Sequence, residues 1–392
     1  MRIGVLTFHC EINYGAVLQC YALQTALTEM GHDVFVIDRW WDDDNVGLER
    51  GYKKWGALRW LKFIVRSLLG LGDFGLWMRC RRTKKFIADY LHLTPYHFVE
   101  WENAPDDLGL DLIVVGSDQV WHCGDWGNPR AYLLDGARKK SLPPAIAYAA
   151  SFGMRSIPSS YVDLFKLRLP DFRTISCRER EGAGICSDLG VEAFHVADPS
   201  LLISKERWCD LVHLPAELSG RVVDNKLICY FMSVDVAASI PLLQAFAKKN
   251  DCEITVFSND GSLFVPPKSL NDFRLVYGNN RVKLYRSGGP LDFVHAFATA
   301  KWVITDSYHA LMFSAIFDCN VRFIRPSNAE RSIMFARIEE FRDRFVVGDL
   351  IEDTVGSALE SIDNGRQMTF DKKGINEFRQ TSRRWLQRAV SI

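Results

Sequence analysis

The stretch KWVITDSYHALMFSAIF, residues 301–317, contains the repeating unit of the fold. Its WVI run is strand-like, and its ALMFSAIF run is typical of a buried helix. The residues between the two runs are Thr305, Asp306, Ser307, Tyr308 and His309. Open α/β sheets bind their ligands beyond the carboxyl ends of the strands, where loops lead into helices. Polar residues at this junction therefore indicate a ligand-binding edge.

The same unit repeats along the chain, because short apolar strand-like runs alternate with helix-like runs. The strand-like runs are RIGVLTF, DVFVID, LDLIVVGS, AIAYAAS, RTISCRE and FHVADP in the first half, and KLICYFMS, EITVFS, RVKLY, WVITDS, VRFIRP and RFVVGD in the second. Alternation of this kind predicts an α/β protein with parallel sheets. Two comparable sets predict two Rossmann-like domains side by side, with one large sheet as the alternative.

The division between the two sets falls near residues 198–205, where DPSLLISKERW carries a proline and then restarts a helical pattern. We therefore predict an N-terminal Rossmann-like domain over residues 1–200 and a C-terminal one over residues 201–365. The remaining stretch, residues 366–392, reads as an amphipathic basic helix. We expect this helix to cross back to the first domain.

The composition limits the possible functions. The chain has 392 residues with 48 Lys and Arg against 48 Asp and Glu, so it has no overall attraction to nucleic acid. Its ten cysteines form no CxxC or CxxH pair, so we expect no metal site, and most lie in apolar runs where thiols behave as core residues. Without a signal peptide or a run of 18 apolar residues, a cytoplasmic protein is expected.

Residues 50–85 interrupt the alternation with a strongly basic segment. They hold eleven Lys and Arg residues against the one acid Asp73, a local charge of +10. Within WGALRWLKFIVRSLLGLG, Arg59, Lys62 and Arg66 recur at helical spacing among large apolar residues. This pattern is typical of a helix on an anionic membrane surface, so we hypothesise contact with the inner face of the membrane. The alternatives are a core helix with a solvated basic face, or a surface that faces a phosphorylated, lipid-linked acceptor.

Two further polar loops follow strand-like runs, in INYGAVLQCYALQ and in VVGSDQVWH. The first holds Asn13, Tyr14 and Gly15, and the second holds Gly116, Ser117, Asp118 and Gln119. The turn at residues 13–15 presents backbone N–H groups that suit a polar or anionic ligand, or it simply caps a helix. Asp118 suits the activation of a hydroxyl, since a carboxylate at a strand end can act as a base. Aspartate is equally a good N-cap.

His309 stands in the first turn of its predicted helix, with Ser307 or Asp306 at the cap. A helix N-terminus disfavours the imidazolium, whereas a bound anion favours it. A histidine in this place can gain its proton when an anionic substrate arrives, which suits a general acid. A capped surface or core histidine is the alternative.

Together these motifs resemble the polysaccharide pyruvyltransferase family. The resemblance rests on INYGAVLQCYALQ, VVGSDQVWH, IAYAASFG and TDSYHALMFSAIF, supported by SCRERE and VADPSLL, and it runs from residue 1 to about residue 340. It implies a fold similar to the two-domain glycosyltransferase-B architecture. It also implies transfer of pyruvyl from phosphoenolpyruvate, the co-substrate, to two hydroxyls of a sugar, which makes a cyclic ketal without a further cofactor. The acceptor would be a surface or capsular polysaccharide, or a lipid-linked oligosaccharide precursor.

The resemblance also implies roles for particular residues. His309 matches the histidine assigned to phosphoenolpyruvate binding and general-acid work, and Arg178 of SCRERE matches a substrate-binding arginine. A third basic residue follows the histidine in the family; Arg331 is the best match and Arg325 the second choice. Some members carry an arginine where this chain has Ser307. We assign Ser307 to phosphoenolpyruvate binding and expect Arg178, Arg325 or Arg331 to share the phosphate contact differently.

The acceptor side would comprise the loops of the first domain. We assign acceptor binding to Asn13, Tyr14, Gly15, Ser117 and Gln119, and activation of the acceptor hydroxyl to Asp118. The chain departs from the family pattern after His309, where Ala310 and Leu311 replace a glycine and a small hydroxylated residue.

Two other functions fit the same sequence. A nucleotide-sugar glycosyltransferase would share the two-domain fold and would need a pocket for the base. A non-catalytic subunit of a polysaccharide assembly complex would explain the replaced residues around His309. Acceptor-dependent turnover of phosphoenolpyruvate distinguishes the transferase from both.

Overall fold

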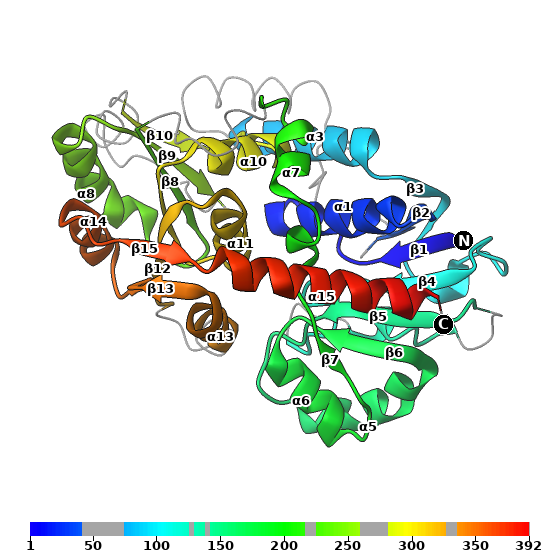
Figure 1. Ribbon diagram of the computed structural model, residues 1–392. Helices are drawn as coiled ribbons and strands as arrows, with labels where there is room; N and C mark the ends of the chain where they lie inside the picture. Colours follow the sequence, from blue (N-terminus) through cyan, green and yellow to red (C-terminus); the bar gives the residue numbers. More distant parts are fainter. Residues whose placement is uncertain are drawn as a thin grey trace.

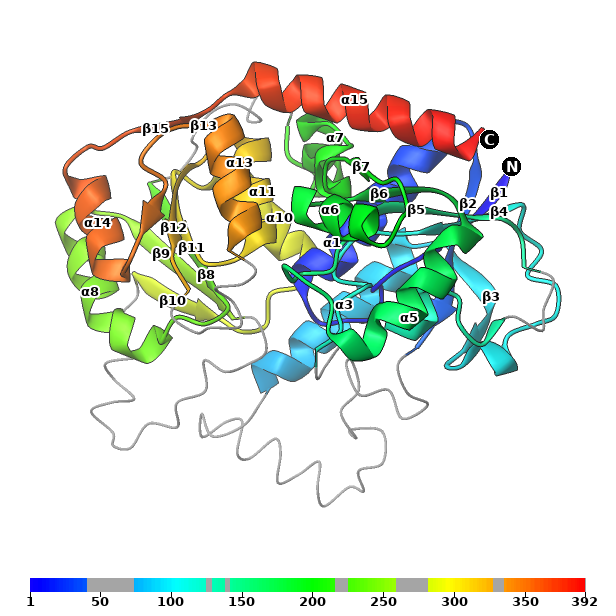
Figure 2. The same ribbon diagram turned by 90° about the horizontal axis from the view of Figure 1, so that it is seen from below.

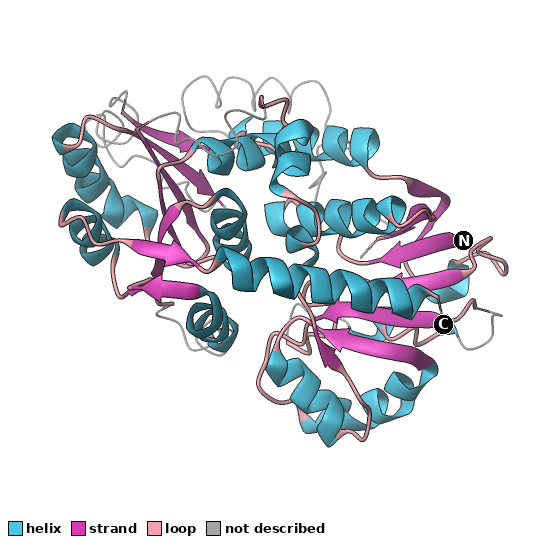
Figure 3. Ribbon diagram, viewed as in Figure 1, coloured by secondary structure: helices cyan, strands magenta, loops and turns pink. Residues whose placement is uncertain are grey.

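The protein consists of two parallel sheets side by side, each flanked by helices (Figures 1 and 3). The computed structural model describes residues 1–40, 74–124, 129–137, 142–215, 225–258, 281–326 and 335–391. This arrangement confirms the predicted α/β class with two Rossmann-like units. All ten cysteines lie in the described part and are buried as free thiols, as expected of core residues.

The N-terminal sheet has seven strands in the order β3-β2-β1-β4-β5-β6-β7, all parallel. Its elements are β1 (Arg2–Leu6), α1 (Tyr14–Glu29), β2 (Asp33–Arg39), α3 (Phe74–Tyr90), β3 (Leu93–Phe98), η2 (Trp101–Asn103), β4 (Leu112–Val115), α4 (Pro129–Tyr132), β5 (Ala145–Ala150), α5 (Ser159–Arg168), η4 (Leu169–Asp171), β6 (Phe172–Cys177), α6 (Arg180–Asp188) and β7 (Phe194–His195). The central strands LIVV and AIAYAA are buried at every position, because helices cover both faces of the sheet.

The C-terminal sheet has six parallel strands in the order β10-β9-β8-β11-β12-β14. The elements from the linker onward are η5 (Pro199–Leu201), α7 (Lys205–Leu211), β8 (Lys226–Phe231), α8 (Val236–Lys249), β9 (Glu253–Ser258), β10 (Val282–Tyr285), α10 (Pro290–Thr299), β11 (Trp302–Thr305), α11 (Tyr308–Phe317), β12 (Asn320–Ile324), α13 (Ala336–Phe345), β13 (Val346–Gly348), β14 (Ile351–Glu352), α14 (Val355–Asp363), β15 (Met368–Phe370) and α15 (Lys372–Val390). The run RFVVGD does not join this sheet, since β13 pairs antiparallel with β15.

Both sheets reverse their strand order at a central pair, β1 and β4 in the first and β8 and β11 in the second. Such a switch point opens a crevice at the carboxyl ends of the strands, because the loops there diverge to opposite faces. The loops after these four strands contain the polar residues that the sequence singled out, so the topology brings them towards one place between the domains.

Helix α15 runs from the C-terminal domain across to the N-terminal one (Figure 2). Its Ser382 hydroxyl accepts a hydrogen bond of 2.9 Å from the Ala197 N–H, and Trp385 packs near the ring of Tyr148. Arg383 Nη1 lies 3.0 Å from Glu29 Oε2 at the end of α1. The last helix therefore ties the second domain to the first.

The first residue of α1 anchors the two domains to each other. The Tyr14 ring stacks on Phe293 at 4.6 Å and meets Tyr230 and Phe257 edge-on, all in the C-terminal domain. Its hydroxyl donates a 2.8 Å hydrogen bond to the Gly288 carbonyl. Tyr14 is 1% exposed, so this predicted acceptor-binding residue is a packing residue of the domain interface.

The described end of the basic segment also faces the domain interface. Arg79 is fully buried, donates to the Ile12 carbonyl at 2.6 Å and lies over the Tyr14 ring at 4.0 Å. Arg82 Nη1 lies 3.0 Å from Asp292 Oδ2 of the second domain. These two arginines serve domain packing, while residues 50–73 lie outside the described residues. In the part of the chain described, no helix is long and apolar enough to cross a membrane.

The Tyr14 contact predicts a graded loss of stability. Tyr14→Phe removes only the hydrogen bond to the Gly288 carbonyl and should cost about 1 kcal/mol. Tyr14→Ala empties a buried aromatic site and should cost about 3–5 kcal/mol. Urea denaturation followed by tryptophan fluorescence measures both. An unchanged midpoint for Tyr14→Ala would show that the domains do not depend on this contact.

Candidate functional site

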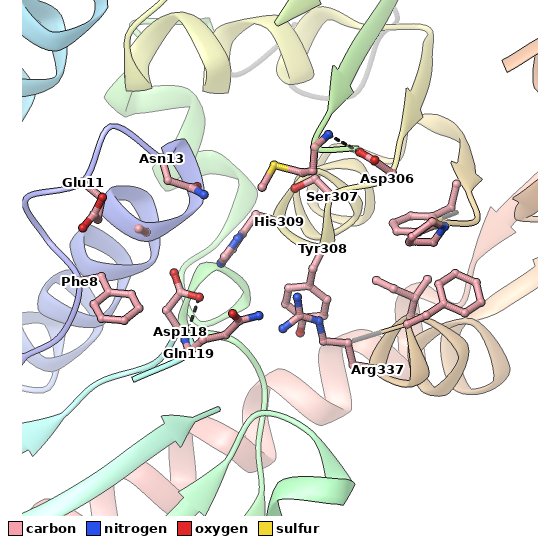
Figure 4. A pocket seen from close by; sticks show the side chains of 16 residues that line it. Phe8, Glu11, Asn13, Asp118, Gln119, Asp306, Ser307, Tyr308, His309 and Arg337 are labelled. Atoms are coloured by element: carbon pink, nitrogen blue, oxygen red, sulfur yellow. Dashed lines mark hydrogen bonds between the residues drawn. The ribbon is translucent and has the colours of Figure 1, made fainter. Parts of the chain in front are cut away.

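A cavity of about 570 Å³ lies between the two domains, at the carboxyl ends of both sheets (Figure 4). The wall from the N-terminal domain carries Phe8, Glu11, Asn13, Asp118 and Gln119. The wall from the C-terminal domain carries the polar residues Asp306, Ser307, Tyr308, His309 and Arg337, beside an apolar group of Met232, Phe323, Pro326, Phe335 and Ile338. The wall from the first domain is therefore acidic and amide-rich, whereas the wall from the second carries one guanidinium, that of Arg337, and one carboxylate, that of Asp306, which is bound by backbone N–H groups.

His309 is in the first turn of α11, as predicted, and its ring lies directly against the start of α1. A Cβ atom on Gly15 would stand 2.1 Å from His309 Nδ1, closer than any real contact. Gly15 therefore allows the histidine to approach the N-terminus of a helix in the other domain. Gly15, which was predicted to bind the acceptor, thus packs against His309, a role that the sequence did not suggest.

The other side of the imidazole faces buried charges. His309 Nε2 lies 3.5 Å from Arg178 Nη1 and 3.7 Å from Asp198 Oδ2. Burial lowers the pKa of His309; Asp118 and Asp198 act against this, and Arg178 and Arg337 add to it, so the pKa remains below its ordinary value. The imidazole is therefore neutral at neutral pH while no anion is bound.

Arg178 is at the centre of the charge cluster, immediately after β6. Its Nη1 lies 3.1 Å from Asp198 Oδ2, and its Nη2 lies 3.6 Å from Asp118 Oδ1. Burial alone would lower the pKa of Arg178, but Asp118, Asp198 and Glu179 raise it above the ordinary value. The guanidinium does not line the cavity, because it lies behind Tyr308, 4.8 Å from the ring centre, and behind His309. Arg178, predicted to bind substrate directly, is therefore enclosed by the carboxylates of the site.

Asp198 and Glu179 complete this cluster, and neither was predicted as a site residue. Asp198 is fully buried, and its Oδ1 accepts from the N–H and the hydroxyl of Ser200 at 2.9 and 2.6 Å. Burial would raise the pKa of Asp198, but His309 in its protonated form, the charge of Arg178 and the hydrogen bonds from Ser200 hold it below its ordinary value. Glu179 Oε1 accepts from the Ser151 hydroxyl at 2.7 Å. Both residues belong to motifs that carry the family resemblance, Asp198 to VADPSLL and Glu179 to SCRERE.

Asp118 is held in a strained backbone conformation at the cavity wall. Its φ of 71° is in the left-handed region that non-glycine residues rarely adopt. The Ser151 N–H donates to its carbonyl at 3.0 Å, and the Gln119 N–H donates to its carboxylate at 2.9 Å. Strain of this kind is concentrated at functional sites. Asp118 caps no helix, because the chain after it forms a turn, and it lines the cavity.

Of the two residues predicted for the cap of α11, Ser307 is the N-cap residue and Asp306 is not. Asp306 accepts hydrogen bonds from the backbone N–H groups of Met232 and Ser233, at 2.5 and 2.7 Å, and so ties β11 to the loop after β8. Ser307 occupies the N-cap position of α11, but its side chain makes no capping hydrogen bond. Ser307 lines the cavity instead, close to where its helix begins.

The third basic residue of the site is Arg337, which the sequence did not single out. It projects from α13 into the cavity, with its guanidinium 4.8 Å from the centre of the Tyr308 ring. Arg325, the second choice, lies 3.3 Å from Asp353 and over the Phe335 ring, and it does not line the cavity. Arg331 lies outside the described residues.

The predicted acceptor residues divide into two groups. Asn13 and Gln119 line the cavity, and Asn13 also caps α1 through its side-chain oxygen, which accepts from the Gly15 N–H at 2.9 Å. Ser117 is completely buried and, like Tyr14, does not line the cavity. Phe8 and Glu11 were missed and do line it. Among the described residues, no group of three or more His, Cys, Asp and Glu is placed to hold a metal ion.

Comparisons with known proteins agree with this architecture. A model of the polysaccharide pyruvyl transferase family matches residues 13–328. No curated protein matches the sequence. The chain is similar to a Listeria monocytogenes protein assigned as a UDP-N-acetylglucosamine 2-epimerase, with a TM-score of 0.50 and 11% identity over 93% of this chain and 86% of that one. It is also similar to Acinetobacter baumannii MurG, with a TM-score of 0.42 and 10% identity over 98% and 94%. At 11% identity the likeness to the Listeria monocytogenes protein concerns the fold alone.

The contact between Gly15 and His309 predicts an effect that a control glycine should not show. Gly15→Ala forces the imidazole or the helix to move and should cost about 1–3 kcal/mol of stability. Gly184→Ala, in helix α6 with open space around it, should leave stability unchanged or raise it by up to about 1 kcal/mol. Urea denaturation measures both variants, and NMR of isotope-labelled histidine reports the environment of His309. Equal effects of the two substitutions would contradict the close approach.

Proposed function

The chain belongs to the polysaccharide pyruvyl transferase family, and we propose that it moves pyruvyl from phosphoenolpyruvate to two hydroxyls of a sugar, closing a cyclic ketal. The acceptor is a surface or capsular polysaccharide or its lipid-linked precursor. One observation carries the proposal: His309 and the guanidinium of Arg337 share one wall of a single cavity, and the carboxylate and amide groups of Asp118, Gln119 and Asn13 lie on the facing wall. An anionic donor and a hydroxylated acceptor each find the complementary surface there.

The donor occupies the side of Arg337, Ser307 and His309. Phosphoenolpyruvate carries up to three negative charges, and a guanidinium can bind carboxylate or phosphate with two parallel hydrogen bonds. Burial lowers the pKa of Arg337, and Arg178 lowers it further, so a bound anion relieves the repulsion between two guanidinium groups. Arg178 contributes its charge from behind the wall and holds Asp118 and Asp198 in place.

His309 acts as the general acid. Without substrate it is neutral, because burial and the two arginines lower its pKa. A phosphoenolpyruvate anion beside it raises that pKa, so the imidazole takes up a proton as the donor binds. His309 then gives the proton to the methylene carbon of phosphoenolpyruvate, which becomes a methyl group and leaves an oxocarbenium-like C2.

The two acceptor hydroxyls then complete the ketal. The first hydroxyl forms a C–O bond to C2 and gives its proton to Asp118. The bond between C2 and the phosphate oxygen breaks, and the second hydroxyl adds to C2 while its proton leaves with the phosphate. The proton on Asp118 returns to solvent, so the products are the ketal and inorganic phosphate. Asn13 and Gln119 line the same wall and orient the hydroxyl pair.

Loss of His309 should abolish transfer. His309→Gln removes the general acid, which is worth about 10²–10⁴-fold in rate. His295→Gln is the matched control, because His295 lies exposed on α10 outside the cavity. Acceptor-dependent phosphate release, with mass spectrometry of the product from lipid-linked oligosaccharides, measures the activity. Near-normal product formation by His309→Gln would remove the histidine from this mechanism.

Donor binding should take up a proton. Because the pKa of free His309 lies below its ordinary value, the imidazole is neutral at pH 7.5 and should gain about one proton when phosphoenolpyruvate binds. Calorimetric titration in buffers of different ionisation enthalpy measures this uptake, which His309→Gln should lose. The pH profiles should show the same shift. Because kcat/KM reports the lower pKa of free His309 and kcat reports its raised pKa in the donor complex, kcat/KM should begin to fall at a lower pH than kcat as the pH rises.

A UDP-sugar that binds in place of phosphoenolpyruvate would favour a glycosyltransferase.

A further inference from the structure

One face of helix α13 is polar and points at the N-terminal domain. Arg337, Glu340 and Arg344 recur at three- and four-residue spacing, which places them on one side of the helix. An adjacent face of the helix buries Ile338, Phe341 and Phe345 in the core. The helix that brings Arg337 into the cavity thus carries a carboxylate one turn further along, on the same side.

The Glu340 side chain contacts two elements of the N-terminal domain. Its Oε1 lies 3.0 Å from Arg180 Nε and 3.5 Å from His195 Nδ1, and its Oε2 accepts from the Arg180 N–H at 3.3 Å. Arg180 is the first residue of α6 and His195 the last of β7. The carboxylate therefore stands at the N-terminus of α6, where a negative charge is favourable. Burial opposes this and raises the pKa of Glu340 above its ordinary value, while the Arg180 N–H and guanidinium act to lower it.

The contacts of Glu340 with Arg180 and His195 lie beside the charge cluster of the candidate site. Arg178, which faces His309, and Arg180, which faces Glu340, belong to the same turn between β6 and α6. A cavity of only about 20 Å³ remains between α13 and the N-terminal domain, lined by Arg178, Asp198, Arg337 and Glu340 among others. This volume is about that of a single water molecule, so the two surfaces are closed on each other.

Electrostatics explains why α13 needs a carboxylate here. The guanidinium groups of Arg178 and Arg337 each lie 4.8 Å from the centre of the Tyr308 ring. Burial lowers the pKa of Arg337, and the like charge of Arg178 lowers it further. Glu179 and Asp118 offset part of this repulsion, but Arg344, on the same face of α13, adds a third positive charge, and Arg180 is a fourth on the opposite side. Glu340 is the acidic residue of this helix face, and it offsets the repulsion where the helix meets α6.

We propose that Glu340 is a positioning residue: by tying α13 to Arg180 and His195, it holds Arg337 in the cavity and sets the affinity for phosphoenolpyruvate. The inference rests on the proposed function, in which Arg337 binds that anion. It extends the donor site to a contact between the domains, outside the cavity itself.

Calorimetric titration of the full-length protein with phosphoenolpyruvate alone tests the role of Glu340. Glu340→Gln should raise Kd about tenfold, and KM with it, whereas kcat at saturating donor should stay within about twofold because His309 is untouched. Glu339→Gln, the neighbouring residue outside these contacts, should leave Kd unchanged. A Glu340→Gln protein that binds like the wild type, or a Glu339→Gln protein that is weakened equally, would overturn the proposal.

A double-mutant cycle gives a second test from the other domain. Arg180→Gln removes the guanidinium but keeps the helix N–H, so it should raise Kd about threefold. The double variant should be no weaker than Glu340→Gln alone, because both changes break the same contact. Losses that multiply to about thirtyfold would show independent roles and overturn the proposal. Thermal unfolding, measured alongside, should be unchanged in all variants that fold.

The wild-type titration separates this inference from the proposed function. If the wild-type protein fails to bind phosphoenolpyruvate, the proposed function falls and the inference with it. If the wild type binds and Glu340→Gln binds equally well, only the role of Glu340 falls.

Discussion

The arrangement of the candidate site depends on one buried positive charge, the guanidinium of Arg178. It is almost fully enclosed and faces Asp198, Asp118 and Glu179. A buried charge is tolerated only when it is paired, and losing one partner of such a cluster costs several kcal/mol. Since these carboxylates follow different strands of the N-terminal sheet, the single guanidinium holds the loops after β4, β6 and β7 together. Arg178 thereby fixes the loops of the N-terminal domain that face His309.

The second domain completes the site because its His309 ring packs directly against the start of α1 in the first domain. His309 can reach the cluster because Gly15 has no side chain, and the neighbouring Tyr14 inserts its ring among aromatic residues of the C-terminal domain. The start of α1 thus serves the interface and the histidine at once. Arg337 arrives on α13 from the same side as His309. Both domains line the cavity, so the proposed chemistry would need the pair of them.

Local patterns predicted much of this structure. The alternation of apolar runs predicted both sheets, and the strand-to-helix junction placed His309 at a ligand-binding edge. Asp118 and Asn13 were found because they directly follow a strand or begin a helix. The predictions for Tyr14 and Ser117 were wrong about the direction of the side chain, since a polar loop motif does not say which of its residues face the cavity. Asp306 was expected at a cap but binds the backbone of the neighbouring strand's loop.

The sequence by itself determined the class of fold, the order of the strand-to-helix units and the histidine at their edge, because all of these follow from short-range periodicity of apolar and polar residues. Only the tertiary structure decided which charges meet. Arg178, Asp198, Arg337 and Glu340 are far apart in the chain and come together across two sheets and a domain boundary. Their roles depend on burial, mutual distance and the loss of solvent screening, and these quantities exist only once the chain has folded.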